Sequence, residues 1–183
     1  MTRKTYAALL RGINVSGHRK VPMAELRALL GELGHTGVRT HLNSGNAVFR
    51  TESTASEEVL ALDLRAAMEK HFGFPVDCVV RDHTYLRTVA QTCPFPAAEL
   101  EGKQLHATFS SGPLDPARYA ALDQASYLPE EFRLGDRVLY LYAPDGLGRS
   151  KLGEALSRPA LHKDLTVTTR NWNTVVKLVE LTQ

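Results

Sequence analysis

The segment from Arg11 to Lys20 combines basic side chains with glycine in a way that suits the binding of an anion. It reads Arg-Gly-Ile-Asn-Val-Ser-Gly-His-Arg-Lys, and Pro22, which suits the first position of a helix, follows soon after. Glycine lets backbone N–H groups approach a ligand closely, and a helix N-terminus favours negative charge. A solvated loop whose glycines only make turns explains the same residues equally well, because short motifs of this kind often match by chance.

Three further polar segments are candidates to line a binding site. Asn43-Ser44-Gly45-Asn46 has the chemistry of a tight turn, and its amides also supply donors and acceptors. Residues 144–151 lead into a helix that Ser150 can cap, with Arg149 and Lys151 beside its N-terminus. Residues 168–174 place Arg170 close to Trp172, a pair typical of binding hot spots, although helix capping and core packing also explain this segment.

No catalytic constellation is recognisable. The seven histidines lack the spacing of a His-Glu-x-x-His metal site, no Gly-x-Ser-x-Gly element is present, and no Cys–His pair is indicated. The glycine spacing of a dinucleotide-binding loop and the Gly-Lys-Ser/Thr ending of a P-loop are absent as well. We therefore predict no metal and no cofactor, and the sequence assigns no catalytic residue.

Composition limits the class of protein. The chain has 183 residues, a hydrophobic fraction of 43% and a net charge of +2, so any basic surface must be local. Cys78 and Cys93 are too few for a disulfide framework and indicate buried thiols in a reducing cytoplasm. No apolar run has the length of a signal sequence or a membrane span, so we expect a cytoplasmic protein without a membrane partner.

The first half of the chain should position the first two polar segments. Apolar periodicity and turn signals predict strands at 6–10, 38–42, 47–50 and 76–80, and helices starting at Pro22 and at the cap residue Ser56. This order is βαββαβ, that of the ferredoxin-like plait. With regular strands, we expect the turn at 43–46 to lie at the opposite end of the sheet from the loop at 11–20. Both segments could then share a site only if two halves of the molecule met end-on.

The second half repeats that order. Strands are expected at 104–110, 131–134, 137–142 and 165–169, with helices beginning at Asp115, at Ser150, and at Asn171 or Asn173. The duplication is inferred from element order, since no residue-by-residue repeat supports it. The predicted fold class is α+β (α/β), with two ferredoxin-like βαββαβ subdomains at 1–82 and 104–183, a connecting helix and loop at 83–103, and a C-terminal helix.

Five motifs resemble those of a known family. They are Leu-Arg-Gly-Ile-Asn-Val at 10–15, Lys-Val-Pro-Met at 20–23, Ser-Gly-Asn at 44–46, Ser-Lys-Leu at 150–152 and Arg-Asn-Trp-Asn-Thr at 170–174. Together they resemble the bacterial domain-of-unknown-function family numbered 1697. That resemblance implies a cytoplasmic protein of two similar ferredoxin-like halves. It assigns no activity, because the family has none assigned to it. The chain departs from the family pattern at Ser16, which stands where the family typically has the first of two glycines.

The motifs fall on the polar loops, and we therefore predict one shared groove. The residues expected to bind a ligand are Arg11, Asn14, Lys20, Ser44, Asn46, Ser150, Lys151, Arg170 and Asn171. They would line a basic cleft between the subdomains that takes an anionic ligand, with a nucleic acid strand or a nucleotide as the best candidate. The paired aromatic residues of RNA-binding plaits are missing from the central strands.

Two alternatives stay open at this point. The first is an enzyme acting on a phosphorylated or carboxylated small molecule, with Arg and Lys stabilising developing charge near Ser44 or Ser150. The second is a structural or interaction protein whose polar motifs only hold the two halves together. The sequence does not indicate the oligomeric state.

Overall fold

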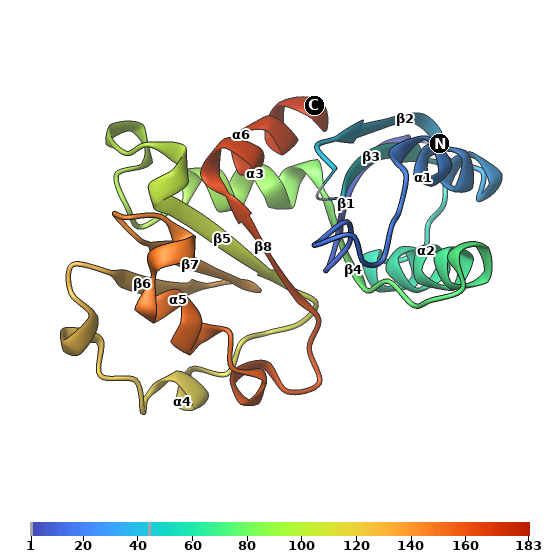
Figure 1. Cartoon of the computed structure of the whole chain (residues 1–183). Coiled ribbons are helices and arrows are strands. Elements are labelled where there is room, and N and C mark those ends of the chain that lie inside the picture. The colour runs from blue at the N-terminus through green and yellow to red at the C-terminus, as the bar shows by residue number, and fades with distance from the viewer. Residues whose placement is uncertain (1, 44) are drawn as a thin grey trace. The chain divides into compact units, whose positions relative to one another are not determined.

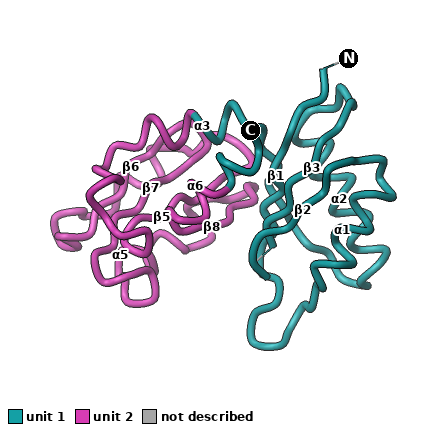
Figure 2. Tube along the Cα trace, turned by 90° about the horizontal axis from the view of Figure 1, so that it is seen from above, with its two compact units in different colours: residues 1–87, 178–183 teal, residues 88–177 magenta. Residues whose placement is uncertain are grey.

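A computed structural model describes residues 2–43 and 45–183. The chain divides into two compact units, shown in different colours in Figure 2. Unit 1 comprises residues 1–87 and 178–183, and unit 2 comprises residues 88–177. The divisions fall within helices α3 (His83–Gln91) and α6 (Trp172–Leu181), which Figure 1 labels.

Unit 1 has the ferredoxin-like arrangement predicted from the sequence. Its elements are β1 (Lys4–Leu10), α1 (Met23–Glu32), β2 (Thr36–His41), β3 (Asn46–Thr51), α2 (Glu57–Phe72) and β4 (Cys78–Asp82). The strands form an antiparallel sheet in the order β2-β3-β1-β4. Ser56 caps α2 by accepting a hydrogen bond from the Val59 N–H, and Gly73 ends it in the left-handed conformation, as its sequence signals predict.

Both faces of the unit 1 sheet are apolar. Helices α1 and α2 cover one face (Figure 1), and their Leu26, Leu30, Leu64 and Met68 pack with alternate strand residues. The opposite face carries Ala7, Leu9, Val48 and Val79, which are also buried. A strand buried on both sides needs apolar residues at successive positions, which accounts for the continuous run from Tyr6 to Leu10.

Unit 2 repeats the strand order with shorter helices. Its elements are β5 (Leu105–Ser110), α4 (Pro116–Tyr119), β6 (Glu131–Gly135), β7 (Val138–Tyr142), α5 (Lys151–Leu156) and β8 (Val167–Asn171). The antiparallel sheet has the order β6-β7-β5-β8. The predicted helix extending through Leu122 stops at Tyr119, although Asp115 caps it as expected.

None of the helices within the described residues is long and apolar enough to cross a membrane. The longest, α2, has 16 residues and is amphipathic, with three fully buried side chains on its inner face.

Candidate functional site

The loop after β1 and the turn before β3 lie side by side in unit 1. The Leu10 N–H donates to the Gly45 carbonyl (2.8 Å), and the Asn14 side-chain Nδ2 donates to the Asn43 carbonyl (2.7 Å). The expectation that these segments occupy opposite ends of the sheet is therefore wrong. Strands β1 and β3 pair antiparallel with Leu9 opposite Asn46, so the end of β1 meets the beginning of β3. We call residues 11–23 together with 42–46 the loop–turn site; Ser44, a predicted ligand residue, lies outside the described residues.

Asn14 holds the loop–turn site in shape. Its Oδ1 accepts the Val21 N–H (2.9 Å), and its Nδ2 donates to the Val21 carbonyl (3.1 Å) as well as to Asn43. One side chain thus joins the start of the loop, the entry to α1 and the β2–β3 turn. The amide that was predicted to bind a ligand makes all of these bonds within the protein.

Gly45 and Asn46 fix the other side of the site. Gly45 has φ +91°, and an added Cβ would lie 2.7 Å from Ile13 Cδ1 and 2.8 Å from Leu10 Cβ. Only glycine fits this position, because the β1–α1 loop packs directly against it. Asn46 is fully buried, and its Nδ2 donates to the His41 carbonyl (2.8 Å) across the hairpin.

Left-handed backbone conformations gather in the same region. Asn14, Ser16, Arg19 and Leu42 have φ between 50° and 61°, and they are four of the six non-glycine residues described with positive φ. Such conformations cost free energy and are found preferentially at functional sites. Ser16, with φ 51°, adopts a conformation that glycine favours.

The loop–turn site contains a hollow at the N-terminus of α1. The hollow has a volume of about 400 Å³ and is lined by Asn14, Gly17, Lys20, Val21, Pro22, Met23 and Asn43. Pro22 is the cap residue of α1 and has no side-chain hydrogen bond to the first turn. The first-turn N–H groups therefore lack the side-chain partner that Ser or Asp would supply.

The loop that forms this hollow carries exposed basic side chains, of which Lys20 lines the hollow itself. The side chains of Arg11, His18 and Lys20 are exposed and make no hydrogen bond or ion pair with any residue in the described ranges. Arg19 is also exposed, with its guanidinium carbon 5.9 Å from the centre of the Phe74 ring. The acidic residue in the first turn of α1, Glu25, is paired with His71 (3.0 Å). The region therefore has a local excess of positive charge.

The N-terminus of α5 in unit 2 differs from that of α1, because side chains of the protein accept hydrogen bonds from its first-turn N–H groups. Ser150 is buried, and its Oγ accepts the Gly153 N–H (2.8 Å), while Glu130 Oε2 accepts the Leu152 N–H (2.8 Å). A carboxylate of the chain thus occupies the place where an external anion would bind. Lys151 is exposed and borders a hollow of about 600 Å³ with Tyr127 and Arg158.

Arg170 and Asn171 belong to a repeat that the sequence analysis missed. Asn171 Oδ1 accepts the Thr174 N–H (3.0 Å) and caps α6, as Asp82 Oδ1 caps α3 by accepting the Tyr85 N–H (2.8 Å). The preceding arginines also match, since Arg170 Nη1 donates to the Thr169 carbonyl (2.9 Å) and Arg81 Nη1 to the Val80 carbonyl (2.8 Å). The two junctions share an arginine followed by Asp or Asn, Arg81-Asp82 and Arg170-Asn171, between a strand and a helix. A two-residue pattern is too short to be recognised as a repeat from the sequence alone.

The two buried arginines differ in their other contacts. Arg81 Nη1 lies 3.2 Å from Glu57 Oε2, and Glu57 Oε1 also accepts the Asp82 N–H (2.9 Å). Arg170 Nη1 donates to Thr168 Oγ1 (2.7 Å), and burial lowers the pKa of its guanidinium to about 10. Both side chains lie inside the protein, so each acts on the structure of its strand–helix junction.

The structure thus brings four predicted residues together in unit 1, while the four in unit 2 lie in two places, the start of α5 and the end of β8. Arg11, Asn14, Lys20 and Asn46 belong to the loop–turn site; Ser150, Lys151, Arg170 and Asn171 lie in unit 2. The single basic cleft that the sequence analysis expects these eight residues to line stays a prediction. Within the described residues, no group of three or more His, Cys, Asp or Glu side chains is placed to hold a metal ion.

Comparisons with known proteins identify the family. The chain superposes on the structure of the conserved bacterial protein SP0830 from Streptococcus pneumoniae with a TM-score of 0.78 and 24% identity, over 100% of both chains. At that identity the likeness shows the fold alone. No significant match is found among curated proteins. The family profile described as "Protein of unknown function (DUF1697)" matches residues 3–140, so the chain belongs to the DUF1697 family.

Proposed function

We propose that this protein binds an anionic ligand, a nucleic acid strand or a nucleotide, at the loop–turn site. The observation that carries this proposal is a hollow that Lys20 lines, at a helix N-terminus without a side-chain cap. Arg11 and His18, exposed basic residues of the same loop, are like Lys20 without partners in the described ranges. A phosphate bound there would accept hydrogen bonds from the first turn of α1 and from Lys20.

The size and surface of the site support a nucleotide-like ligand over a simple ion. A hollow of about 400 Å³ is within the range of small-molecule pockets. The exposed apolar side chains of Val15 and Leu42 belong to the same loop and turn and offer contact area to a base or sugar. Of the residues that the sequence predicts in unit 2, Lys151 is exposed, and its contribution to binding is tested by the same experiment.

Ligand-induced shifts in melting temperature test the proposal. Nucleotides, short oligonucleotides and sugar phosphates are compared, and binding of an oligonucleotide should weaken steeply with added salt. Lys20→Ala should weaken binding by about tenfold or more, since a charge-assisted hydrogen bond contributes about 1.5–3 kcal/mol. Lys4→Ala is the matched control, an exposed lysine at the far end of β1.

Two results would contradict the proposal. One is that none of the anions stabilises the protein; the other is that Lys20→Ala and Lys4→Ala bind equally well. Turnover of a sugar phosphate would favour the enzyme alternative over a binding module. Lys151→Ala, measured beside Lys20→Ala and Arg11→Ala, reports whether the unit 2 motifs take part.

A bacterial cytoplasm is the proposed location. Cys78 and Cys93 are both free thiols in the structure, which supports a reducing compartment. The similar structure of SP0830 is that of a bacterial protein.

A further inference from the structure

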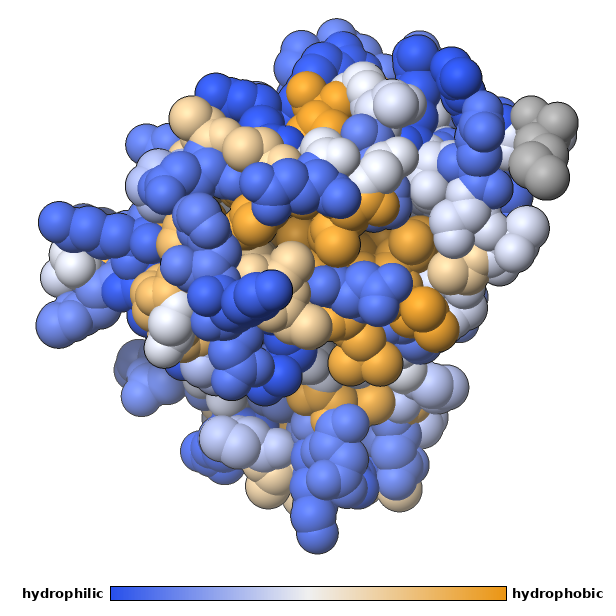
Figure 3. Space-filling view, turned by 90° about the vertical axis from the view of Figure 1, so that its right-hand side faces the viewer, coloured by the Kyte–Doolittle hydropathy of each residue, from blue (hydrophilic) through white to orange (hydrophobic). Residues whose placement is uncertain are grey.

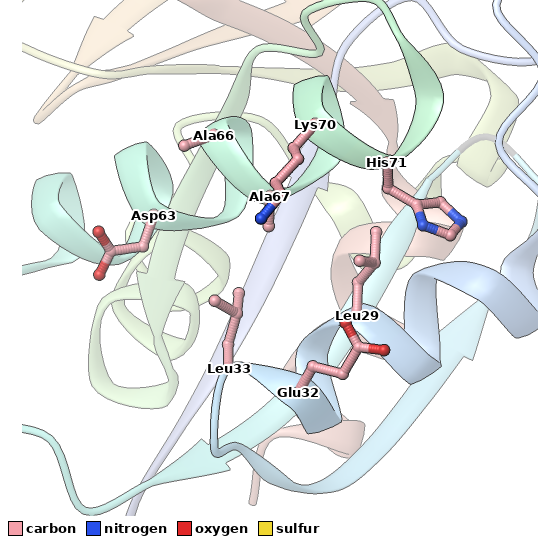
Figure 4. A pocket seen from close by; sticks show the side chains of 8 residues that line it. All are labelled: Leu29, Glu32, Leu33, Asp63, Ala66, Ala67, Lys70 and His71. Atoms are coloured by element: carbon pink, nitrogen blue, oxygen red, sulfur yellow. The ribbon is translucent and has the colours of Figure 1, made fainter.

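Helices α1 and α2 of unit 1 form a groove on their outer side, away from the loop–turn site. The groove has a volume of about 580 Å³ and is lined by Leu29, Glu32, Leu33, Asp63, Ala66, Ala67, Lys70 and His71. Figure 4 shows Asp63 and Leu33 toward one end of the groove and His71 toward the other. The floor is apolar and the rim is charged, which is typical of an interaction surface.

Apolar side chains are exposed along this face. Leu62 is 63% exposed, Val59 44% and Leu33 37%, and together they make up three of the eight large hydrophobic residues that are exposed in the described chain. Figure 3, which views the side of unit 1 that carries α1 and α2, shows apolar surface at the centre with hydrophilic surface around it. Scattered apolar residues need no explanation, whereas a group on one face marks a contact surface.

One row of residues runs along the outer face of α2. Val59, Asp63, Ala66 and Lys70 follow each other at intervals of four, three and four residues. Ala66, at the middle of this row, is small enough to let a second helix approach closely. The row is exposed, since α1 and the sheet contact other faces of α2.

The charges on this face complement each other in an antiparallel arrangement. Asp63, Glu32 and Lys70 make no hydrogen bond or ion pair with the described residues, while the neighbouring His71 is paired with Glu25. Asp63 therefore lies toward one end of the groove, and Lys70 lies two turns farther along α2 (Figure 4). A two-fold axis between Ala66 and Ala67 brings each Asp63 opposite Lys70 of the partner subunit, because the two residues share one face of α2 two turns apart.

We propose that this face is the contact surface of a homodimer in which the α2 helices of two copies run antiparallel. Each α2 lies along the α1–α2 groove of the other copy, with Lys70 of the partner subunit opposite Asp63. Burial of Val59, Leu62 and Leu33 supplies the affinity, and the two symmetric charge pairs fix the orientation. The same patch serves on both copies, as a two-fold interface requires.

Sedimentation velocity and light scattering on the full chain, across a wide range of protein concentration, test the dimer. The natural protein should dimerise as its concentration rises. Asp63→Lys alone and Lys70→Asp alone should each raise the dimer dissociation constant by about tenfold or more, because each places like charges opposite one another twice. The double variant D63K/K70D should dimerise like the natural protein.

Mixing the two single variants gives the sharpest result. Each D63K chain presents lysine at both positions of the charge pair, and each K70D chain presents aspartate at both. In a one-to-one mixture opposite charges therefore meet, and a heterodimer should form at a protein concentration at which neither variant dimerises alone. Asp145→Lys and Lys163→Asp, at exposed positions of unit 2, are the charge-matched controls and should dimerise normally. Circular dichroism verifies that every variant is folded.

Each of the remaining outcomes overturns the proposal. They are a natural protein that stays monomeric at every concentration, a dimer that both single charge reversals leave unchanged, and single variants that do not associate when mixed. If α2 instead binds a different protein, the natural protein stays monomeric at every concentration, and the homodimer proposal is wrong. Ligand binding at the loop–turn site is independent of this result, since none of its residues lies in the groove.

Discussion

Asn14 connects three segments of the loop–turn site through one side-chain amide. The three segments are its own loop, the entry to α1 at Val21 and the turn at Asn43. Val21 is buried, so its N–H would lose its partner if the amide were removed. Asn14 also has φ 54°, a conformation that asparagine tolerates better than alanine does.

Asn14→Ala should therefore reduce the free energy of unfolding by about 2–4 kcal/mol, from lost hydrogen bonds and added backbone strain. Urea unfolding measures the change. Asn14→Gly is the control, because it loses the same hydrogen bonds while it accepts the positive φ. It should be less destabilising than alanine by about 1 kcal/mol, and equal losses would show that backbone strain contributes nothing.

Ser16 offers a change in the opposite direction. Ser16 is exposed and has φ 51°, so Ser16→Gly should remove backbone strain at little cost in contacts. We expect an increase of about 0.5–1 kcal/mol in the free energy of unfolding, after allowing for the greater freedom of glycine in the unfolded chain. Thermal unfolding measures it, with Ser16→Ala as the control. A glycine variant no more stable than the alanine variant would contradict the presence of backbone strain at Ser16.

At the level of elements, the strand–helix junctions after β4 and β8 are the common feature of the two units. Asp82 and Asn171 are both the last strand residue and the cap of the helix that follows. No loop separates strand from helix, so the cap sets the direction in which α3 and α6 leave their sheets.

Asn171→Ala should reduce the free energy of unfolding by about 1 kcal/mol, because the Thr174 N–H loses its acceptor. Asn171→Asp should retain most of the stability, since Asp82 performs the same task in unit 1. Denaturant unfolding of the two variants side by side measures the difference. Equal destabilisation by alanine and aspartate would show that the cap is not what stabilises this junction.

The sequence predicted these elements well where side-chain pattern alone decides them. Leu26, Leu30, Leu64 and Met68 give the inner faces of α1 and α2, and Ser56 and Gly73 mark the ends of α2. Strands β4 and β8 were expected at 76–80 and 165–169 but end at Asp82 and Asn171. Asp82 and Asn171 each end a strand and cap the helix that follows. Sequence signals alone do not show that these residues still belong to the strand; that depends on their pairing with β1 and β5.

The candidate site was predictable in its residues and not in its geometry. Arg11, Lys20 and Asn46 were identified from composition and turn chemistry. The contact between Asn14 and Asn43 depends on the antiparallel register of β1 and β3, a long-range property that sequence periodicity does not contain. The hydrogen bond from the Leu152 N–H to the Glu130 carboxylate at the start of α5 was not predicted for the same reason. The two residues are 22 positions apart in the sequence.

For the whole molecule, one histidine in each unit with a buried Nδ1 makes stability depend on pH. His35 is partly buried in unit 1 and packs against Phe49 with ring centres 4.4 Å apart, and His106 is buried on β5 in unit 2. Neither Nδ1 has a hydrogen-bond partner within the described parts of the chain. Burial lowers the pKa of both side chains from the ordinary value of 6.5, and Asp63 opposes the effect at His35.

The direction of the effect follows from proton binding. A lowered pKa in the folded state means that the unfolded chain binds a proton first as the solution is acidified, which favours unfolding. The stability is complete above pH 6.5, the ordinary pKa, and is lost as the pH falls through the lowered pKa of each histidine. His106→Gln should make the melting temperature less dependent on pH below that value, and His35→Gln should do so to a smaller extent, because Asp63 offsets part of its shift. Thermal unfolding between about pH 5 and 7.5 measures these slopes, with the exposed His18→Gln as the control. If the natural protein and the His106 variant lose stability in parallel on acidification, groups other than the buried histidine cause the loss.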